Sequence, residues 1–379
     1  MKVVLSVEPV RFPLTGIGRY AYELAKGLQA SDELTELKLF SGTRFLPGLP
    51  EPMNESSGAH GLKRLVQKSN LAMEAYRLLM PLLRKQALKG HDDFIYHGPN
   101  FFLPPFPGRK VATFHDLSPF KWAECFDPAK VRYLQKEFER TLKIADALIT
   151  DSEFTRHELA KFAGWPLDKI HAVPLAAGPE FRPRKEEELQ PLLKRYGLNY
   201  QGYSLFVGTI EPRKNIIRLL DAYELLPKAT RELWPLIITG YRGWKSDDIH
   251  ARIKDAERQG WAKYLGFLPA EELPLLYSGA RLFVFPSLYE GFGLPVLEAM
   301  QSGVPVVCSD RGSLPEVAGD AALLANPNDV SELTQSINNS LSNDESTRKV
   351  LVARSTARAS KFNWEACSNG TTSVYRKLT

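Results

Sequence analysis

Short apolar runs alternate with longer amphipathic stretches along most of the chain. In the first half the apolar runs lie at residues 3–7, 37–40, 94–96, 110–114, 147–150 and 171–174. In the second half they lie at residues 203–207, 235–239, 262–265, 282–285, 304–308 and 321–324. Strands that alternate with helices are typical of parallel sheets flanked by helices. Because the two sets are similar in size, we expect an α/β protein with two doubly wound domains.

The boundary between the two domains is expected near residue 183. Residues 178–183 contain one glycine and two prolines, which interrupt the alternation, and a charged run at 184–188 follows them. We therefore assign residues 1–183 to a first domain and residues 184–358 to a second domain.

The pattern of the last residues of the chain predicts a helix. After residue 326 the pattern is helical to the end, and the final segment contains Trp364 and Tyr375. These side chains are too apolar for a free tail. We expect residues 359–379 to pack back on the body of the protein.

Composition indicates an ordinary soluble protein: 44% of the 379 residues are hydrophobic and 25% are charged. The three cysteines, an odd number without a Cys-x-x-Cys pair, support neither a disulfide framework nor a zinc site. The first apolar run is too short for a signal peptide, and no apolar stretch approaches the roughly 20 residues that span a bilayer. We expect a cytoplasmic protein, with any membrane contact peripheral.

Charge is concentrated in one segment, residues 62–89, although the net charge of +5 is modest and suggests no nucleic-acid partner. Two interpretations remain open. One is a pair of solvated helices whose apolar stripe packs on the core. The other is a basic amphipathic surface on the inner face of the plasma membrane that meets anionic lipid or a phosphate-bearing acceptor. The segment has one acid, Glu74, and seven basic residues: Lys63, Arg64, Lys68, Arg77, Arg84, Lys85 and Lys89.

The first loop places Gly16 and Gly18 in a Gly-x-Gly-x-x-Ala pattern before a helix. This spacing fits a dinucleotide fingerprint and keeps a nicotinamide-dependent dehydrogenase open as an alternative. Against it, the glycines lie well beyond the strand end, and the second strand lacks the acid that would hold a ribose. Glycines at a helix N-terminus still let backbone amides approach an anion.

A second loop, residues 208–215, follows a buried strand directly. The loops at strand carboxyl ends form the ligand crevice of an open parallel sheet, so Arg213 and Lys214 are expected to point into it. Adjacent cations there suit a diphosphate, because they stabilise charge that develops on a leaving group. Gly208 allows close approach of the backbone.

The strongest signal lies between two glutamates, Glu290 and Glu298. Gly291 and Gly293 open a turn after a strand, and Pro295 suits the first position of a helix. Carboxylates at these positions match the vicinal hydroxyls of a hexose or a ribose. The amides of the turn, at a helix N-terminus, could hold a phosphate; they belong to Phe292, Gly293 and Leu294.

These motifs together closely resemble the retaining glycosyltransferases of family 4, whose GT-B fold has two facing Rossmann-like domains with a cleft between them. The resemblance runs through the whole chain: the Gly16/Gly18 loop, His115-Asp116, Gly208 to Asn215, Gly266-Phe267-Leu268-Pro269, the two glutamates, and Gly303-Val304-Pro305-Val306-Val307.

The resemblance implies a division of roles for the donor, a nucleotide sugar. Arg213 and Lys214 would bind its diphosphate, Glu298 the ribose and Glu290 the transferred sugar, and Phe267 would abut the base. It implies transfer with retention of configuration and without a metal or another cofactor.

His115 is the residue that the resemblance assigns to the donor sugar from the first domain. On sequence alone, a single histidine at a strand end is as often a structural hydrogen-bonding group.

The run Glu211-Pro212-Arg213-Lys214-Asn215 most resembles bacterial mannosyltransferases that build lipopolysaccharide O-antigen from GDP-mannose. The implied partners are a nucleotide sugar and a glycan or polyprenyl-linked glycan acceptor. A UDP- or dTDP-sugar donor stays open, as does a catalytically silent nucleotide-binding module.

Overall fold

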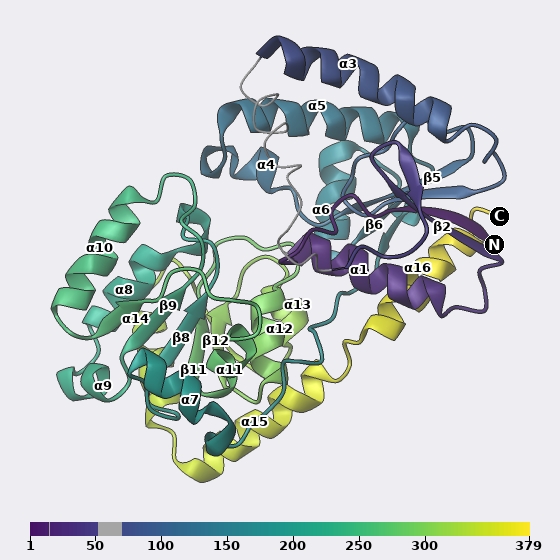
Figure 1. The fold of residues 1–379 in the computed structure, drawn as a ribbon. Helices are drawn as coiled ribbons and strands as arrows, with labels where there is room; N and C mark the ends of the chain where they lie inside the picture. Colours follow the sequence, from purple (N-terminus) through teal and green to yellow (C-terminus); the bar gives the residue numbers. More distant parts are fainter. Residues whose placement is uncertain (15, 52–69) are drawn as a thin grey trace.

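The computed structural model describes residues 1–14, 16–51 and 70–379, which form two lobes, each built on its own sheet (Figure 1). The strands of the first sheet lie in order β3-β2-β1-β4-β5-β6-β7, and those of the second in order β10-β9-β8-β11-β12-β13. Every strand pair is parallel except β2 with β3. The expected α/β architecture with two doubly wound, Rossmann-like domains is confirmed.

All twelve expected strands are present, and one more was missed. The short edge strand β3 pairs antiparallel with β2 after a turn at Gly42, whose φ is +65°. β3 follows β2 with no helix between them, so the alternation of strands and helices does not predict it. The first sheet contains β1 (Lys2–Ser6), β2 (Glu36–Ser41), β3 (Arg44–Leu46), β4 (Ile95–Gly98), β5 (Arg109–Phe114), β6 (Ala147–Thr150) and β7 (Ile170–Ala172). The second contains β8 (Ser204–Val207), β9 (Leu236–Thr239), β10 (Ala262–Tyr264), β11 (Leu282–Phe285), β12 (Val306–Ser309) and β13 (Leu323–Ala325).

Helices cover both faces of each sheet. Those of the first lobe are α1 (Gly16–Gln29), α3 (Asn70–Ala87), α4 (Ser118–Lys121), η1 (Ala123–Cys125), α5 (Pro128–Ile144), α6 (Glu153–Ala163) and η2 (Leu167–Lys169). Those that follow are α7 (Glu186–Tyr196), η3 (Pro212–Lys214), α8 (Ile216–Glu224), α9 (Lys228–Leu233), α10 (Asp247–Arg258), α11 (Leu273–Ser278), α12 (Leu294–Gln301), α13 (Leu314–Ala318), α14 (Val330–Ser342), α15 (Glu345–Ala359) and α16 (Trp364–Arg376).

The central strands are buried on both faces, which explains why they read as continuous apolar runs. In β1, Val3 and Leu5 join one hydrophobic cluster, and Val4, which points the other way, joins a second. All three side chains are fully buried. Alternate side chains of one strand therefore fill two separate layers.

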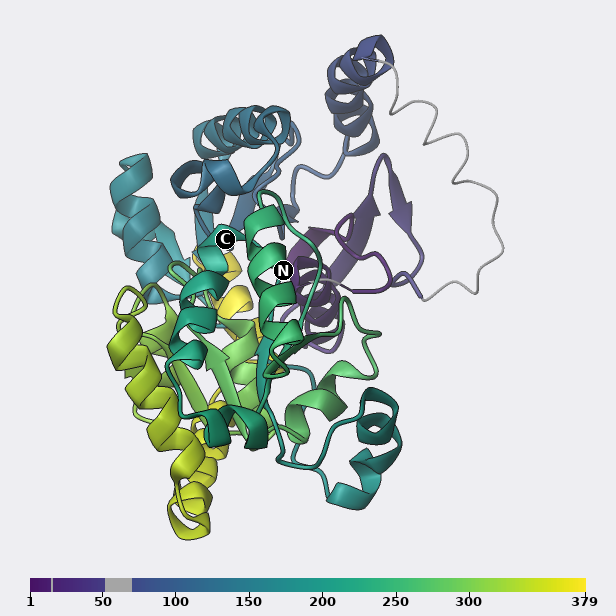
Figure 2. The same ribbon diagram turned by 90° about the vertical axis from the view of Figure 1, so that its left-hand side faces the viewer.

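The last helix of the chain returns to the first lobe. In both views the final helices, drawn in yellow, run from the second lobe to the first (Figures 1 and 2). α15 packs on α12, and α16 packs on α1. Gly27 permits the close approach of α16, because a Cβ there would lie 2.6 Å from the Cβ of Ser368. Tyr375 is fully buried, so the end of the chain is part of the first lobe's core.

Strand order defines where ligands bind. β1 lies between β2 and β4, and β8 lies between β9 and β11. In each sheet the strand order therefore reverses beside the first strand. Ligands of open α/β sheets bind outside the strand carboxyl ends at such reversals. The loops after β8 and β11 in one lobe, and after β1 and β4 in the other, are therefore the places to examine. The strands of the two sheets fall within residues 1–183 and 184–358, and the domain boundaries themselves stay a prediction.

Candidate active site

The loop after β8 turns two cations inward. Pro212 begins the 3₁₀ helix η3, and Asn215 ends it in the left-handed conformation with φ +59°. The Asn215 amide donates to the carbonyls of Pro286 and Pro327 at 3.1 and 2.7 Å. This local geometry buries the side chains of Arg213 and Lys214. Arginine and lysine side chains are seldom buried in proteins unless they are paired.

Glu290, from the loop after β11, neutralises both cations. Lys214 Nζ lies 2.5 Å from Glu290 Oε1, and Arg213 Nη1 lies 3.3 Å from Glu290 Oε2. Arg213 also donates to Glu211 Oε1 at 2.6 Å, and Ser287 Oγ to Glu290 Oε1 at 2.5 Å. Two cations and two carboxylates thus form one buried cluster, which we call the ionic cluster.

The ionic cluster sets the protonation of its members. Burial raises the pKa of Glu290, but the charges of Lys214 and Arg213 lower it by more, so its net shift is downward. Burial lowers the pKa of Lys214, and the Glu290 charge opposes this without reversing it. Burial also lowers the pKa of Arg213, but Glu290 and Glu211 raise it by more. The opposite charges outweigh the effect of burial for Glu290 and Arg213 and reduce it for Lys214, so the stability of the cluster depends on mutual compensation.

The turn before α12 has the form that its glycines require. Gly293 has φ +109° and caps α12, and Pro295 lies in the first turn of the helix. A Cβ on Gly293 would lie 2.6 Å from Leu314 Cδ2. Gly16 of α1 faces this helix start, since a Cβ there would lie 3.9 Å from Leu294 Cδ1. The structure thus brings the first glycine loop and the α12 N-terminus together across the two lobes, although Gly18 itself is buried within α1.

Glu298 occupies a different environment from Glu290. Burial raises its pKa to about 7, while the Tyr277 hydroxyl and the charge of Arg19 hold it back in part. Arg19 forms an ion pair with Glu180 at 2.8 Å, so its charge is shared. Glu298 therefore titrates near neutrality, with the ability to donate as well as accept a hydrogen bond.

His115 follows β5 in the first lobe and is held at both ring nitrogens. Nδ1 lies 2.7 Å from Asp151 Oδ2, and Nε2 lies 2.9 Å from the Pro99 carbonyl oxygen. Burial lowers the pKa of His115, but the charge and hydrogen bond of Asp151 raise it by more. The Pro99 carbonyl can only accept, so Nε2 donates to it, and Nδ1 faces Asp151, whose own pKa is raised by burial.

The loop that carries Glu290 also joins the two lobes. Ser152 and Thr155 donate to the Gly291 carbonyl at 2.7 and 2.9 Å. A Cβ on Gly291 would lie 1.9 Å from the carbonyl oxygen of His115, so only glycine fits. The Tyr289 hydroxyl accepts from the Leu117 amide at 3.0 Å. His115 and Glu290 therefore flank one interlobe contact.

Phe267 lies apart from the ionic cluster and is half-exposed. Its ring stacks on that of Tyr241 with centroids 3.9 Å apart. Gly240 donates to the Gly266 carbonyl at 2.8 Å, and a Cβ on Gly240 would lie 1.8 Å from the Gly208 oxygen. Gly208 and Phe267 thus share the carboxyl edge of the second sheet.

Two supporting residues escaped the sequence analysis. Asp151 follows β6 as His115 follows β5, and these strands are neighbours, so strand adjacency could have indicated the pair. Glu211 precedes Arg213 and had no separate signal. No group of three or more His, Cys, Asp or Glu side chains that could hold a metal lies within the described residues.

Of the basic segment 62–89, residues 62–69 lie outside the described residues. Arg84 forms an ion pair with Glu8 at 2.6 Å and donates to the Gly42 carbonyl, so it is partly buried against the first lobe. Lys85 and Lys89 are exposed. No helix in the described part of the chain has the length and apolarity needed to cross a membrane.

Comparisons with known proteins identify the family of the chain. Residues 14–180 match the model for Glycosyltransferase Family 4, and residues 194–357 match that for Glycosyl transferases group 1. The chain is 47% identical to O-antigen chain mannosyltransferase B of Escherichia coli, with 100% of both chains covered. It is 35% identical, over 68% of its length and 32% of the relative's, to the serotype-specific mannosyltransferase WbdA of Escherichia coli.

A solved structure has the same fold as this chain. HepE of Anabaena, solved with UDP and glucose, superposes with a TM-score of 0.71 at 16% identity, and 100% of each chain is covered. The family models leave no support for the dehydrogenase suggested by the first glycine loop. The chain belongs to the family 4 glycosyltransferases and has their two-domain GT-B fold.

Proposed function

We propose that this protein is a retaining mannosyltransferase that moves mannose from GDP-mannose to a glycan or polyprenyl-linked glycan during assembly of lipopolysaccharide O-antigen. The name of the 47% identical relative supports the sugar and the product class. The observation that carries the proposal is the ionic cluster, which holds Arg213 and Lys214 within 3.3 Å of one carboxylate, that of Glu290. A donor diphosphate is the ligand that such a pair of cations suits best.

Donor binding exchanges one anion for another. The diphosphate takes over Arg213 and Lys214, which frees the Glu290 carboxylate for the hydroxyls of the transferred sugar. The two cations then stabilise the negative charge that grows on the departing diphosphate. They supply the charge stabilisation for which other transferases use a divalent ion, so we propose transfer without a metal.

The rest of the donor lies along α12. The amides of Phe292, Gly293 and Leu294 at the helix start complete the diphosphate site. Glu298, one turn further on, accepts hydrogen bonds from the ribose hydroxyls, and Phe267 contacts the base.

Transfer then proceeds on one face of the sugar. The acceptor oxygen forms a bond to C1 as the bond from C1 to the phosphate oxygen breaks, and the acceptor proton passes to the departing phosphate. Both ring nitrogens of His115 are bonded within the first lobe, so the ring itself, held beside the Gly291 peptide, forms the wall against which the transferred sugar lies. The protein contributes position and charge, which suit a reaction without a strong base.

The acceptor enters from the first lobe. A cavity of about 540 Å³ lies at the carboxyl ends of β1 and β4, lined in part by Glu8, Arg11, Asn100 and Lys130. Pro99, which holds His115, also lines it. Carboxylate, amide and cationic groups suit the hydroxyls and phosphate of a short lipid-linked glycan.

The test measures mannose transfer from GDP-mannose, with UDP-glucose and a dTDP-sugar as competing donors. Arg213→Ala and Lys214→Ala are each expected to lower kcat by about 10²–10³, the usual loss for one charge-stabilising contact. Arg258→Ala, an exposed cation on α10, is the matched control and keeps the wild-type rate. Turnover of a UDP- or dTDP-sugar instead, or wild-type rates in both variants, would overturn the assignment.

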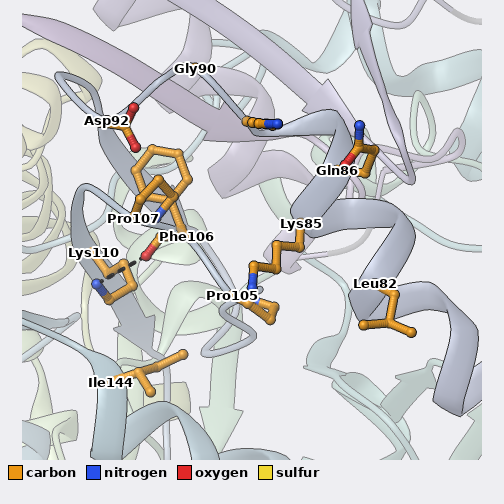
Figure 3. A pocket seen from close by; sticks show the side chains of 11 residues that line it. Leu82, Lys85, Gln86, Gly90, Asp92, Pro105, Phe106, Pro107, Lys110 and Ile144 are labelled. Atoms are coloured by element: carbon orange, nitrogen blue, oxygen red, sulfur yellow. Dashed lines mark hydrogen bonds between the residues drawn. The ribbon is translucent and has the colours of Figure 1, made fainter.

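We also propose peripheral contact with the inner face of the plasma membrane through α3. Leu79, Leu82 and Leu83 are 56%, 65% and 52% exposed. Leu82 lines a groove of about 1050 Å³. Leu82 and Lys85 lie on one side of this groove and Lys110 lies on the other (Figure 3). An apolar strip edged by cations suits an anionic bilayer surface.

This contact is tested with vesicles of phosphatidylcholine with and without phosphatidylglycerol. The double variant Lys85→Glu/Lys89→Glu is expected to bind the anionic vesicles about tenfold or more weakly, since each basic residue near such a surface is worth about 1 kcal/mol. Lys254→Glu/Arg258→Glu, which makes the same charge change on α10, should bind as the wild type does. Equal binding by both double variants would exclude the α3 surface.

A further inference from the structure

A chain of buried hydrogen bonds joins the last helix to the proposed active site. His97 Nδ1 lies 2.6 Å from the Tyr375 hydroxyl of α16, and Nε2 lies 2.8 Å from Thr113 Oγ1 on β5. Thr113 Oγ1 lies 2.9 Å from the Tyr20 hydroxyl of α1. His97, Thr113 and Tyr375 are 0% exposed and Tyr20 is 1% exposed. We call these four residues the buried relay.

The buried relay ends against His115. The ring of Tyr20 meets the His115 ring edge-on, with centroids 5.1 Å apart and an interplanar angle of 84°. Tyr20 is a buried residue of α1, two positions after Gly18. The four side chains come from α1, β4, β5 and α16, and their hydrogen bonds determine how these elements meet beneath the site.

His97 is the link between the two ends of the buried relay. Burial and the nearby His115 lower the pKa of His97 to about 3, so His97 is neutral with one N–H and one lone pair. One of its ring nitrogens therefore donates and the other accepts, and the hydroxyls of Tyr375 and Thr113 on either side complete the chain. Asp151 Oδ1 is buried and has no hydrogen-bond partner among the described residues.

We propose that Tyr375 and His97 are positioning residues: through Thr113 and Tyr20 they hold the His115 ring and the start of α1 in the geometry needed for transfer. The inference rests on the proposed role of His115. The chain's last helix then contributes to turnover as well as to the stability of the first lobe. The proposal assigns to Tyr375 a hydroxyl function that a phenylalanine would not supply.

The first test compares Tyr375→Phe with Thr371→Val. Both remove one buried hydroxyl from α16, but that of Thr371 bonds only back to the Cys367 carbonyl of its own helix. We expect Tyr375→Phe to lower kcat about three- to tenfold, as for the loss of one neutral hydrogen bond, with little change in the KM for the donor. Thr371→Val should keep the wild-type kcat at a similar loss of thermal stability. Equal kcat values in the two variants would overturn the proposal.

A double-mutant cycle with His115→Ala shows whether the effect passes through His115. If it does, Tyr375→Phe has no further effect on kcat in the His115→Ala background. The same fold-loss in both backgrounds would mean a general structural role and would contradict the proposal. So would a wild-type kcat in His115→Ala itself.

A readout without turnover separates this proposal from the proposed function. The imidazole NMR resonances of His115, assigned by their absence in His115→Ala, are expected to move in Tyr375→Phe and to stay in place in Thr371→Val. Unmoved resonances in Tyr375→Phe would refute positioning even in an active enzyme. Shifted resonances in a protein that transfers no mannose would leave the buried relay standing and refute only the proposed function.

Discussion

The charged residues of the site differ in how their burial is compensated. Glu290 shares two cations and stays ionised, because an isolated buried carboxylate would be far less stable. Glu298 forms no ion pair among the described side chains, and its pKa rises to about 7. Groups at a binding site often lower the free energy of unfolding, because the site is selected for function. This matches the proposed role of Glu298 in binding the ribose hydroxyls.

Glu298 should therefore lower the stability of the free protein as the pH rises. Its folded pKa exceeds the ordinary value of 4.5, so the folded state keeps a proton that the unfolded chain loses between pH 4.5 and about 7. Glu298→Gln is expected to gain about 1–3 kcal/mol over the wild type at pH 8, with the gain shrinking toward pH 5. Urea unfolding at both pH values measures it.

The control for this prediction is Glu271→Gln, an exposed carboxyl on the same lobe. It should change stability little at either pH. A Glu298→Gln gain that is the same at pH 5 and pH 8 would show that the carboxyl is not the cause. We also expect weaker stabilisation of Glu298→Gln by added GDP.

At the scale of elements, the loop between β11 and α12 does two jobs at once. It supplies Glu290 to the ionic cluster, and its Gly291 carbonyl accepts from Ser152 and Thr155 of the other lobe. Closure of the lobes and placement of the carboxylate thus depend on one peptide. The close approach of the His115 carbonyl allows no side chain at that position.

Gly291→Ala is expected to separate the lobes and to lower transfer by about 10²-fold, the effect of a displacement of about 1 Å at a reacting centre. Binding of GDP to the second lobe should persist. Gly48→Ala is the matched control, because a Cβ there meets nothing within 4 Å. If Gly291→Ala retains the rate of Gly48→Ala, the interlobe contact is not needed for transfer.

Sequence reasoning found elements better than partners. Twelve of the thirteen described strands were expected because buried parallel strands leave apolar runs between helices, whereas β3 follows β2 with no helix between them. Arg213, Lys214 and Glu290 could be proposed from their positions after strands. That Glu290 neutralises both cations, and that Asp151 holds His115, are tertiary facts that no local pattern records.

At the scale of the whole molecule, the two lobes are joined by contacts from distant parts of the chain. Glu316 of α13 accepts from the amides of Glu153 and Phe154 at 2.9 and 3.0 Å, and so caps α6 of the first lobe. α16 joins the first lobe from the other end of the chain. Such contacts hold the donor and acceptor sides in register, as a reaction between two bound substrates requires.

The central claim is that mannose passes from GDP-mannose to a glycan with its configuration kept. The direct measurement is the proton NMR spectrum of the product formed from GDP-α-mannose and a lipid-linked or synthetic glycan acceptor. We expect the one-bond carbon–proton coupling at C1 of the new residue to be that of an α-mannoside. A β-mannoside would contradict retention, and the absence of any transferred mannose would contradict the assigned donor.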